Sequence, residues 1–120
     1  MSDSSPSAGE VWLVTLDPTV GAEMAKTRPA VVLTNAALEH VPLRVVVPLT
    51  TWQERFSAQP LKIRLTPSPM NGLHRASAGD VIQVRSVSVR RFVGRLGAVD
   101  ADVLAELRAG VATVAGFRPS

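Results

Sequence analysis

The sequence GEVWLVTLDPTVGAEMAKTRPAVVLT occupies residues 9–34 and contains two strand-like runs separated by a polar loop. Residues 10–16 are rich in β-branched and aromatic side chains, which favour a strand. Residues 30–34 form a second apolar run directly after Arg28 and Pro29. Because proline keeps the residue before it extended, Arg28 is expected at the start of this strand and not in a helix.

Further along the chain, more apolar stretches predict strands. Residues 43–49 are mostly valine, which is typical of a buried central strand, and Pro48 fits a position where no ladder donor is needed. Residues 61–66 alternate apolar with polar side chains, which indicates a half-buried strand. The last strand candidates are residues 81–84 and 92–96.

The tail has the spacing of an amphipathic helix, with Asp100 in the N-cap position before an apolar stripe. Short strands with Gly/Pro turns followed by one helix predict a mainly β domain, a small and partly open barrel with a C-terminal helix. We assign this single domain to residues 9–117. We expect residues 1–8, which are rich in serine, to form a disordered leader.

The composition narrows the functional classes. Lys and Arg number 13 against 10 Asp and Glu, which gives a net charge of +3, and 11 of the 13 are arginine. Because this charge is mild, any binding of nucleic acid depends on where the arginines lie. The chain has 0 cysteines, which excludes disulfides, thiol nucleophiles and thiolate metal sites. No apolar run approaches the roughly 20 residues of a membrane helix, and the start lacks a signal-peptide pattern, so we expect a cytoplasmic protein without a membrane partner.

The sequence lacks the motifs of several common kinds of catalytic site. His40 and His74 lie far apart with no carboxylate at ligand spacing, so neither a metal nor a cofactor is predicted. No serine stands in a nucleophile-elbow context, and residues 94–97 lack the further glycine and the lysine of a phosphate loop. The polar cluster in residues 21–29, followed later by Thr50, stands out instead.

These segments carry a resemblance to a known family. Residues 9–23 together with residues 28–33 closely resemble the opening of the MazF/PemK/Kid family of toxin endoribonucleases. Residues 46–51 resemble a later strand of that family with its Thr/Ser end. Residues 83–86 resemble its Gln-x-Arg-Thr segment, and the tail resembles its closing helix. The resemblance covers roughly residues 9–116.

The resemblance implies a homodimer of SH3-like, CcdB/MazF-like barrels that acts as the toxin of a type II toxin-antitoxin system. Its implied activity is metal-independent, sequence-selective cleavage of single-stranded RNA such as mRNA, by attack of a 2′-hydroxyl on the adjacent phosphate. An antitoxin with an extended C-terminal tail would occupy the same groove, and DNA would be contacted only through the antitoxin. Two alternatives stay open: a CcdB-like toxin that poisons a DNA topoisomerase, and a catalytically lapsed domain that binds RNA or antitoxin.

Carried over residue by residue, Arg28 and Thr50 match the family's catalytic arginine and threonine, and Glu23 matches an acidic residue of its first loop. These residue types suit the chemistry because negative charge gathers on the phosphate oxygens in the transition state. Arg28 would donate charge-assisted hydrogen bonds to them, and Thr50 or Thr51 would donate a hydroxyl. The plain alternative for Arg28 is a surface arginine that pairs with Glu23.

Three positions depart from the family's pattern. Met24 stands where a glutamine is usual, Thr27 where some members have a histidine, and Ile82 where many have an acidic residue. No general base is therefore evident. Asp80, which is one pleat away from Ile82, and the loop histidine His74 are candidate substitutes or supporting groups.

Other side chains near these segments are expected to bind RNA. Arg85 and Arg64 are candidates for phosphate contacts, and Trp52 is a candidate for stacking on an unpaired base. Trp12 shares a strand face with Val14 and is expected in the core. The full set of expected RNA-binding residues is Lys26, Thr27, Thr51, Trp52, Arg64 and Arg85.

Overall fold

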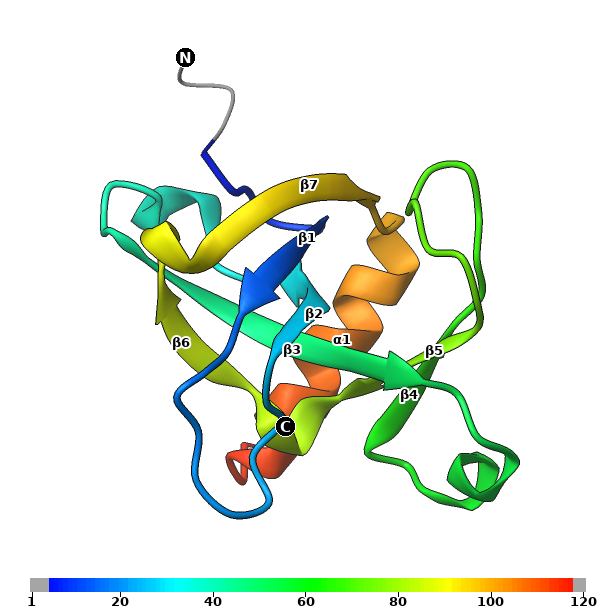
Figure 1. Cartoon of the computed structure of the whole chain (residues 1–120). Coiled ribbons are helices and arrows are strands. Elements are labelled where there is room, and N and C mark those ends of the chain that lie inside the picture. Colours follow the sequence, from blue (N-terminus) through cyan, green and yellow to red (C-terminus); the bar gives the residue numbers. More distant parts are fainter. Residues whose placement is uncertain (1–4, 118–120) are drawn as a thin grey trace.

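The computed structural model describes residues 5–117 and shows one antiparallel sheet with a single long helix (Figure 1). The strands are β1 (Glu10–Thr15), β2 (Thr27–Val32), β3 (Leu43–Thr51), β4 (Lys62–Leu65), β5 (Ser77–Asp80), β6 (Arg85–Ser88) and β7 (Phe92–Ala98), and the helix is α1 (Ala101–Val114). Short 3₁₀ helices lie in the connections: η2 (Ala36–Leu38), η3 (Glu54–Ala58), η4 (Val81–Gln83) and η5 (Val89–Arg91).

The sheet has the strand order β4-β5-β3-β2-β1-β7, and every pairing is antiparallel. The long strand β3 is its centre, because β6 pairs with the first half of β3 while β5 pairs with its end. The sheet curls without closing, since β4 and β7 end the path and do not pair with each other. The expected mainly β, partly open barrel with a C-terminal helix is confirmed.

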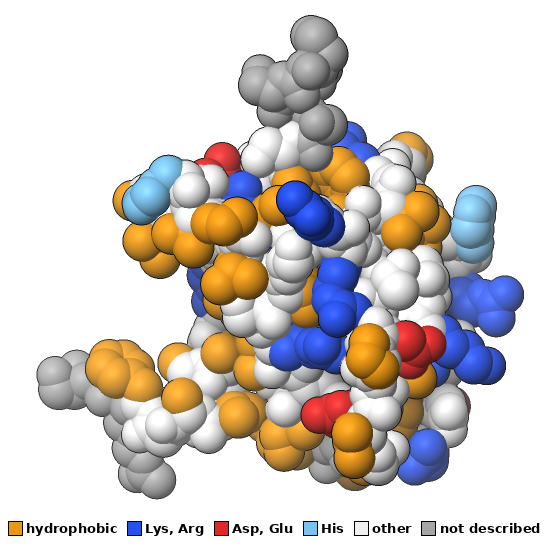
Figure 2. Space-filling model, turned by 60° about the vertical axis from the view of Figure 1, so that its left-hand side comes forward, with side chains coloured by type: hydrophobic (Ala, Val, Ile, Leu, Met, Phe, Trp, Pro, Cys, Tyr) orange, Lys and Arg blue, Asp and Glu red, His pale blue; other side chains and the backbone are white. Residues whose placement is uncertain are grey.

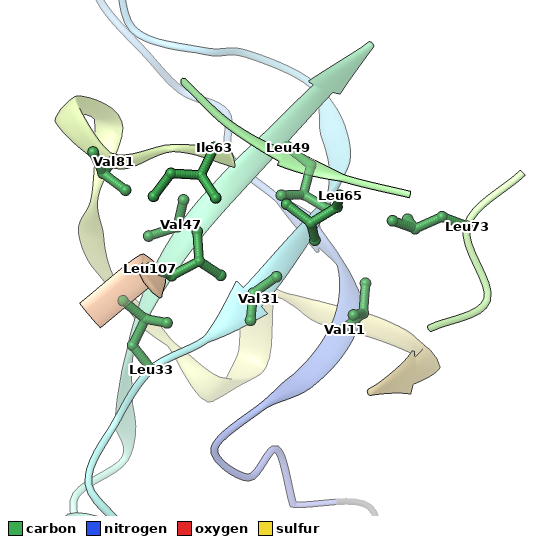
Figure 3. Packing of buried hydrophobic residues seen from close by; sticks show 10 residues of the cluster. All are labelled: Val11, Val31, Leu33, Val47, Leu49, Ile63, Leu65, Leu73, Val81 and Leu107. Atoms are coloured by element: carbon green, nitrogen blue, oxygen red, sulfur yellow. The ribbon is translucent and has the colours of Figure 1, made fainter. Parts of the chain in front are cut away.

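Both faces of the sheet bury apolar side chains, because alternate residues of a strand point to opposite sides. Figure 3 shows the larger cluster, in which Leu107 of α1 lies against the side chains of the strands. Leu107 is fully buried, which stabilises the docked helix by about 1.5–3 kcal/mol. The second cluster includes Val14 and Trp12, and Trp12 is 6% exposed, which confirms its expected place in the core.

The helix begins where the sequence predicts it. Asp100 is the N-cap, and its Oδ1 accepts a hydrogen bond from the backbone N–H of Val103 at 2.8 Å. This bond satisfies one of the backbone donors that a helix leaves unpaired in its first turn.

The strand predicted over residues 81–84 is wrong, because these residues enter the 3₁₀ helix η4 and the turn after it. The strand β5 lies just before this point, where no strand is predicted from the sequence. Its residues Ser-Ala-Gly-Asp have little β propensity, so the sequence gives no strand signal there. Packing explains the glycine of β5, because a Cβ on Gly79 would lie 2.8 Å from Cδ2 of Leu107.

The structure also differs from the expected leader. Residues 1–4 lie outside the described residues, but residues 5–8 pack on the domain and Pro6 is buried. Nε of Arg44 donates to the Pro6 carbonyl at 2.8 Å, and its Nη2 donates to the hydroxyl of Ser5 at 3.1 Å. Arg44 is only 2% exposed, so this contact ties the start of the described chain to β3.

A glycine on β7 lies against the loop that precedes β5, and its replacement should be costly. A Cβ on Gly97 would lie 2.2 Å from the carbonyl oxygen of Met70, which is backbone and cannot rotate away. We expect Gly97→Ala to lower the free energy of unfolding by about 1–3 kcal/mol, as overpacking does. Urea unfolding followed by circular dichroism measures this change.

The matched control is Gly94→Ala on the same strand, because nothing lies within 4 Å of a Cβ there. This variant should be neutral or slightly stabilising, since alanine restricts the unfolded chain. Equal stability of the two variants would contradict the close approach of β7 and the loop.

Glu10 makes the stability of the fold depend on pH. Burial would raise the pKa of its carboxyl, but hydrogen bonds from Trp12 and Ser7 and the contact with Arg95 outweigh it and lower the pKa below 4.5. The unfolded state therefore binds the proton first, and the stabilisation is present above about pH 4.5 and is lost as the pH falls through the lowered pKa. We expect Glu10→Gln to destabilise the protein at pH 7 and to reduce the loss of stability between about pH 5 and pH 3.

Urea unfolding at several pH values measures this difference. Glu106→Gln is the control, because Glu106 is an exposed residue of α1. If Glu10→Gln and Glu106→Gln lose stability in parallel with the natural chain on acidification, Glu10 has no such role.

Candidate active site

The strands β2 and β3 pair over only part of their lengths. Their ladder ends at the Ala30–Pro48 pair, although β2 begins at Thr27 and β3 continues to Thr51. Pro29 lacks the backbone N–H that would face Leu49 in a continued ladder, whereas the missing N–H of Pro48 faces away from β2. Beyond this point β3 pairs with β5 over its last residues, and the two strands part.

A cavity of about 440 Å³ lies where β2 and β3 part. Its wall on the far side is the segment of residues 72–77, which leads into β5. Leucines make the apolar part of the lining, and threonine and serine hydroxyls lie among them. The leucines are Leu13, Leu49, Leu73 and Leu96, and the hydroxyls belong to Thr27, Thr50, Thr51 and Ser77.

The charges in this cavity are of one sign. Lys26, Arg28 and Arg75 line it together with His74, and no aspartate or glutamate of the described residues does. Cationic donors without a competing carboxylate suit an anion such as a phosphate group. The basic side chains of the chain are thus unevenly distributed, although its net charge is mild. Figure 2 shows Lys and Arg side chains grouped on one face of the molecule.

Arg28 has terminal donors available for a ligand. Its side chain is half-buried, and its Nε donates to the carbonyl of Ala25 at 2.9 Å. The pairing with Glu23 that the sequence leaves open is not formed, because Glu23 instead accepts a hydrogen bond from the backbone N–H of Val20 at 2.7 Å. Within the described residues the two terminal nitrogens of Arg28 make no hydrogen bond, so they are free to donate to a bound anion.

The loop that carries Lys26 and Arg28 has a fixed conformation. Lys26 has a φ of 71°, a left-handed backbone that residues other than glycine rarely adopt. Its carbonyl accepts a hydrogen bond from the backbone N–H of Leu16 at 2.9 Å. Strained residues of this kind persist where their surroundings hold them, often at functional sites.

Gln83 and Arg85 lie outside the cavity and stabilise this loop by hydrogen bonds. The side chain of Gln83 accepts from the N–H of Met24 at 3.1 Å and donates to the carbonyl of Ala22 at 3.0 Å. Arg85 donates to the carbonyl of Leu16 at 3.2 Å. The Gln-x-Arg segment therefore holds the first loop in place, and Arg85 does not line the cavity.

Asp80 also lies outside the cavity. It is 5% exposed, forms an ion pair with Lys62 at 3.2 Å and accepts a hydrogen bond from the backbone N–H of Ile82 at 3.2 Å. Its carboxylate therefore ends β5 and holds β4, while Ile82 is 59% exposed on η4.

Trp52 and Arg64 form a second surface beside the cavity. The guanidinium carbon of Arg64 lies 5.0 Å from the centre of a Trp52 ring, and Nε1 of Trp52 donates to Glu54 at 3.2 Å. The two residues contact each other as a cation–π pair, and neither lines the cavity.

The cavity thus brings together only part of the residues predicted from the sequence. Those that line it are Lys26, Thr27, Arg28, Thr50, Thr51 and His74, and those that do not are Glu23, Trp52, Arg64, Asp80 and Arg85. Arg75 and Ser77 line it without having been predicted. Their signal in the sequence is weak, because Arg75 is one of 11 arginines and Ser77 begins a strand of small residues.

Residues 5–117 contain neither a cluster of metal ligands nor a helix that could span a membrane. No three His, Asp or Glu side chains in this range lie close enough together to hold a metal ion. No helix in the same range is long and apolar enough to cross a membrane.

The fold and the cavity define a small, incompletely closed antiparallel β domain with a cavity lined by cationic and hydroxyl side chains at the parted ends of two strands. The model of the family described as PemK-like, MazF-like toxin of type II toxin-antitoxin system matches residues 7–115. The chain belongs to this family, which confirms the resemblance seen in its sequence and its assignment to the toxin endoribonucleases.

Similar proteins agree with this assignment. The chain is 32% identical over 105 residues to Endoribonuclease MazF9 of Mycobacterium tuberculosis, and this match covers 82% of this chain and 86% of that protein. It is 51% identical over 49 residues to Endoribonuclease PemK of Escherichia coli, and this match spans 40% of the chain and 37% of PemK.

Solved structures share the fold. MazF from Deinococcus radiodurans has a TM-score of 0.79 at 29% identity, covering 94% of this chain and 98% of that one. A MazE-MazF complex from the same organism has a TM-score of 0.72 at 29% identity, covering 95% and 98%.

Proposed function

We propose that this chain is the toxin of a type II toxin-antitoxin system and cleaves single-stranded RNA in the cavity between the parted ends of β2 and β3. The lining of that cavity is the main support, because it offers cations and hydroxyls and no carboxylate of the described residues. A phosphodiester needs such donors, and they bind more strongly as its oxygens gain charge in the transition state. The names of the similar endoribonucleases point the same way.

In the proposed reaction the RNA supplies its own nucleophile. The 2′-hydroxyl attacks the adjacent phosphorus, the bond from phosphorus to the 5′-oxygen breaks, and the products are a 2′,3′-cyclic phosphate and a 5′-hydroxyl. Arg28 donates from its terminal nitrogens to the phosphate oxygens, and Thr50 donates its hydroxyl to the same group. Because no water needs activation, the proposal requires neither metal nor cofactor.

His74 is the proposed site of proton transfer. It lines the cavity, and histidine is the side-chain type that exchanges protons near neutral pH. Arginine stays protonated there, so Arg28 is assigned to charge stabilisation. Asp80 is assigned to structure because it pairs with Lys62.

The proposed partners are an antitoxin and a second copy of this chain. The antitoxin is inferred from the MazE-MazF complex that shares the fold. We expect an extended C-terminal tail of the antitoxin, with acidic side chains, to enter the same cavity as RNA, because both carry anions that suit its cations. DNA would be contacted only through the antitoxin, and the cytoplasm is the expected compartment. The topoisomerase-poisoning alternative is not favoured by the comparisons.

Arg28→Ala should abolish most of the activity. Purified protein with a long single-stranded RNA in EDTA is expected to give discrete cuts, and the variant should lower kcat by about 10²–10³-fold, as loss of an oxyanion donor does. Arg90→Ala is the matched control, because Arg90 is exposed and does not line the cavity.

RNA left intact by the natural chain would contradict the proposed function. Retained binding of the antitoxin would then indicate a catalytically lapsed domain, and inhibition of DNA supercoiling would indicate a topoisomerase poison.

His74→Ala and Asp80→Asn separate the two candidate groups for proton transfer. We expect His74→Ala to lower kcat by about 10²–10⁴-fold, as loss of a general acid or base does. Asp80→Asn should keep kcat near that of the natural chain and lower the melting temperature, because the buried carboxylate holds Lys62. The opposite pair of results would assign the proton transfer to Asp80, and near-natural rates for both variants would show that neither residue performs it.

A further inference from the structure

Most arginines of the described chain already donate to oxygens of the same molecule. Those with such a hydrogen bond from the guanidinium are Arg28, Arg44, Arg55, Arg85, Arg91, Arg95 and Arg108. Within residues 5–117 only Arg64, Arg75 and Arg90 have none, and Arg64 is stacked on Trp52. Arg75 is the one of these three that lines the cavity.

Arg75 and Arg28 reach the cavity from opposite sides of the end of β3. Arg28 lies on β2, whereas Arg75 lies just before β5, and β3 is between β2 and β5 in the sheet. The segment of Arg75 is tied to β3, because Ser77 pairs with Thr51 and the N–H of Trp52 donates to the Ala76 carbonyl at 2.9 Å.

The loop before Arg75 is held by a buried asparagine. Asn71 is 6% exposed, and its Oδ1 accepts from the N–H groups of Ser68 and Leu73, each at 3.0 Å. Its Nδ2 donates to the carbonyl of Thr66 at 2.9 Å. Both the oxygen and the nitrogen of this amide therefore serve to fix the loop.

The next residue fixes the loop against β7. Gly72 has a φ of +68°, and a Cβ there would lie 2.1 Å from the carbonyl oxygen of Leu96. Leu73 then enters the core. The backbone that leads to Arg75 is thus in place before a ligand binds, and only the exposed side chain of Arg75 remains to be ordered.

We propose that Arg75 binds a phosphate of the RNA next to the one at which Arg28 acts. This inference rests on the proposed RNA cleavage. A guanidinium with all its donors unused, on a fixed wall and with no carboxylate of the described residues lining the cavity, suits a phosphate oxygen. Because Arg75 holds a phosphate that does not react, it contributes equally to the bound substrate and to the transition state, and is a positioning residue.

Steady-state cleavage of a single-stranded RNA in EDTA, and binding of a fluorescent single-stranded RNA at several salt concentrations, test this role. We expect Arg75→Ala to raise KM about tenfold with kcat within about twofold of the natural chain, the sign of lost uniform binding. The slope of log K against log salt should fall in magnitude by about 0.7, the value for one phosphate contact on a single strand. Arg90→Ala is the matched control and should change neither quantity.

The two proposals fail in different ways. If Arg75→Ala matches Arg90→Ala in KM and salt slope, the role of Arg75 is overturned while RNA cleavage stands. A fall in kcat at unchanged KM also overturns it, because Arg75 would then act at the reacting phosphate. If the natural chain does not cleave RNA, the proposed function fails, and the binding assay still decides whether Arg75 contacts a phosphate. Circular dichroism of both variants confirms that they are folded.

Discussion

The interrupted ladder between β2 and β3 is the constraint on which the site depends. Pro29 removes the backbone donor that would face Leu49, and the strands part beyond the Ala30–Pro48 pair. Arg28 directly precedes Pro29 and Thr50 follows Pro48 by two residues, so both lie at the edge of the gap. The cavity is thus a product of the sheet's own hydrogen-bonding pattern.

A gap in a sheet keeps its shape only if its walls are held. Side chains outside the cavity do this: Gln83 and Arg85 hold the loop that carries Arg28, and Asn71 holds the opposite loop. The apolar clusters on both faces of the sheet stabilise the strands that carry these walls. The backbone that carries the donors of the cavity is therefore in place before a ligand arrives, which reduces the reorganisation that electrostatic stabilisation requires.

The sequence predicts most of the fold because its signals are local. The valine-rich run of β3, the alternation of β4 and the N-cap at Asp100 each specify one element. β5 is not predicted because its residues have little β propensity, and its Gly79 packs against Leu107, a residue distant in the sequence. The strand predicted over residues 81–84 fails because a cap from Asp80 turns the chain.

For the candidate site, too, the sequence predicts the residues that belong to a local motif and misses those that depend on tertiary contacts. Arg28 and Thr50 follow from their motif and both line the cavity. Arg85 and Asp80 carry the right charges, but tertiary contacts commit them to the Leu16 carbonyl and to Lys62. Arg75 has no motif, and only the fold brings it to the cavity. Charge type alone therefore does not separate bracing residues from ligand-binding ones.

The central claim is that RNA binds where β2 and β3 part. The most direct measurement is the change in backbone amide chemical shifts when the isotope-labelled chain binds a single-stranded RNA with a 2′-deoxynucleotide at the cut site, which blocks the reaction. If RNA binds in this cavity, the largest changes are expected in residues 26–29, 49–51 and 72–77. Changes confined to α1 or to the surface around Trp52 and Arg64 would contradict it.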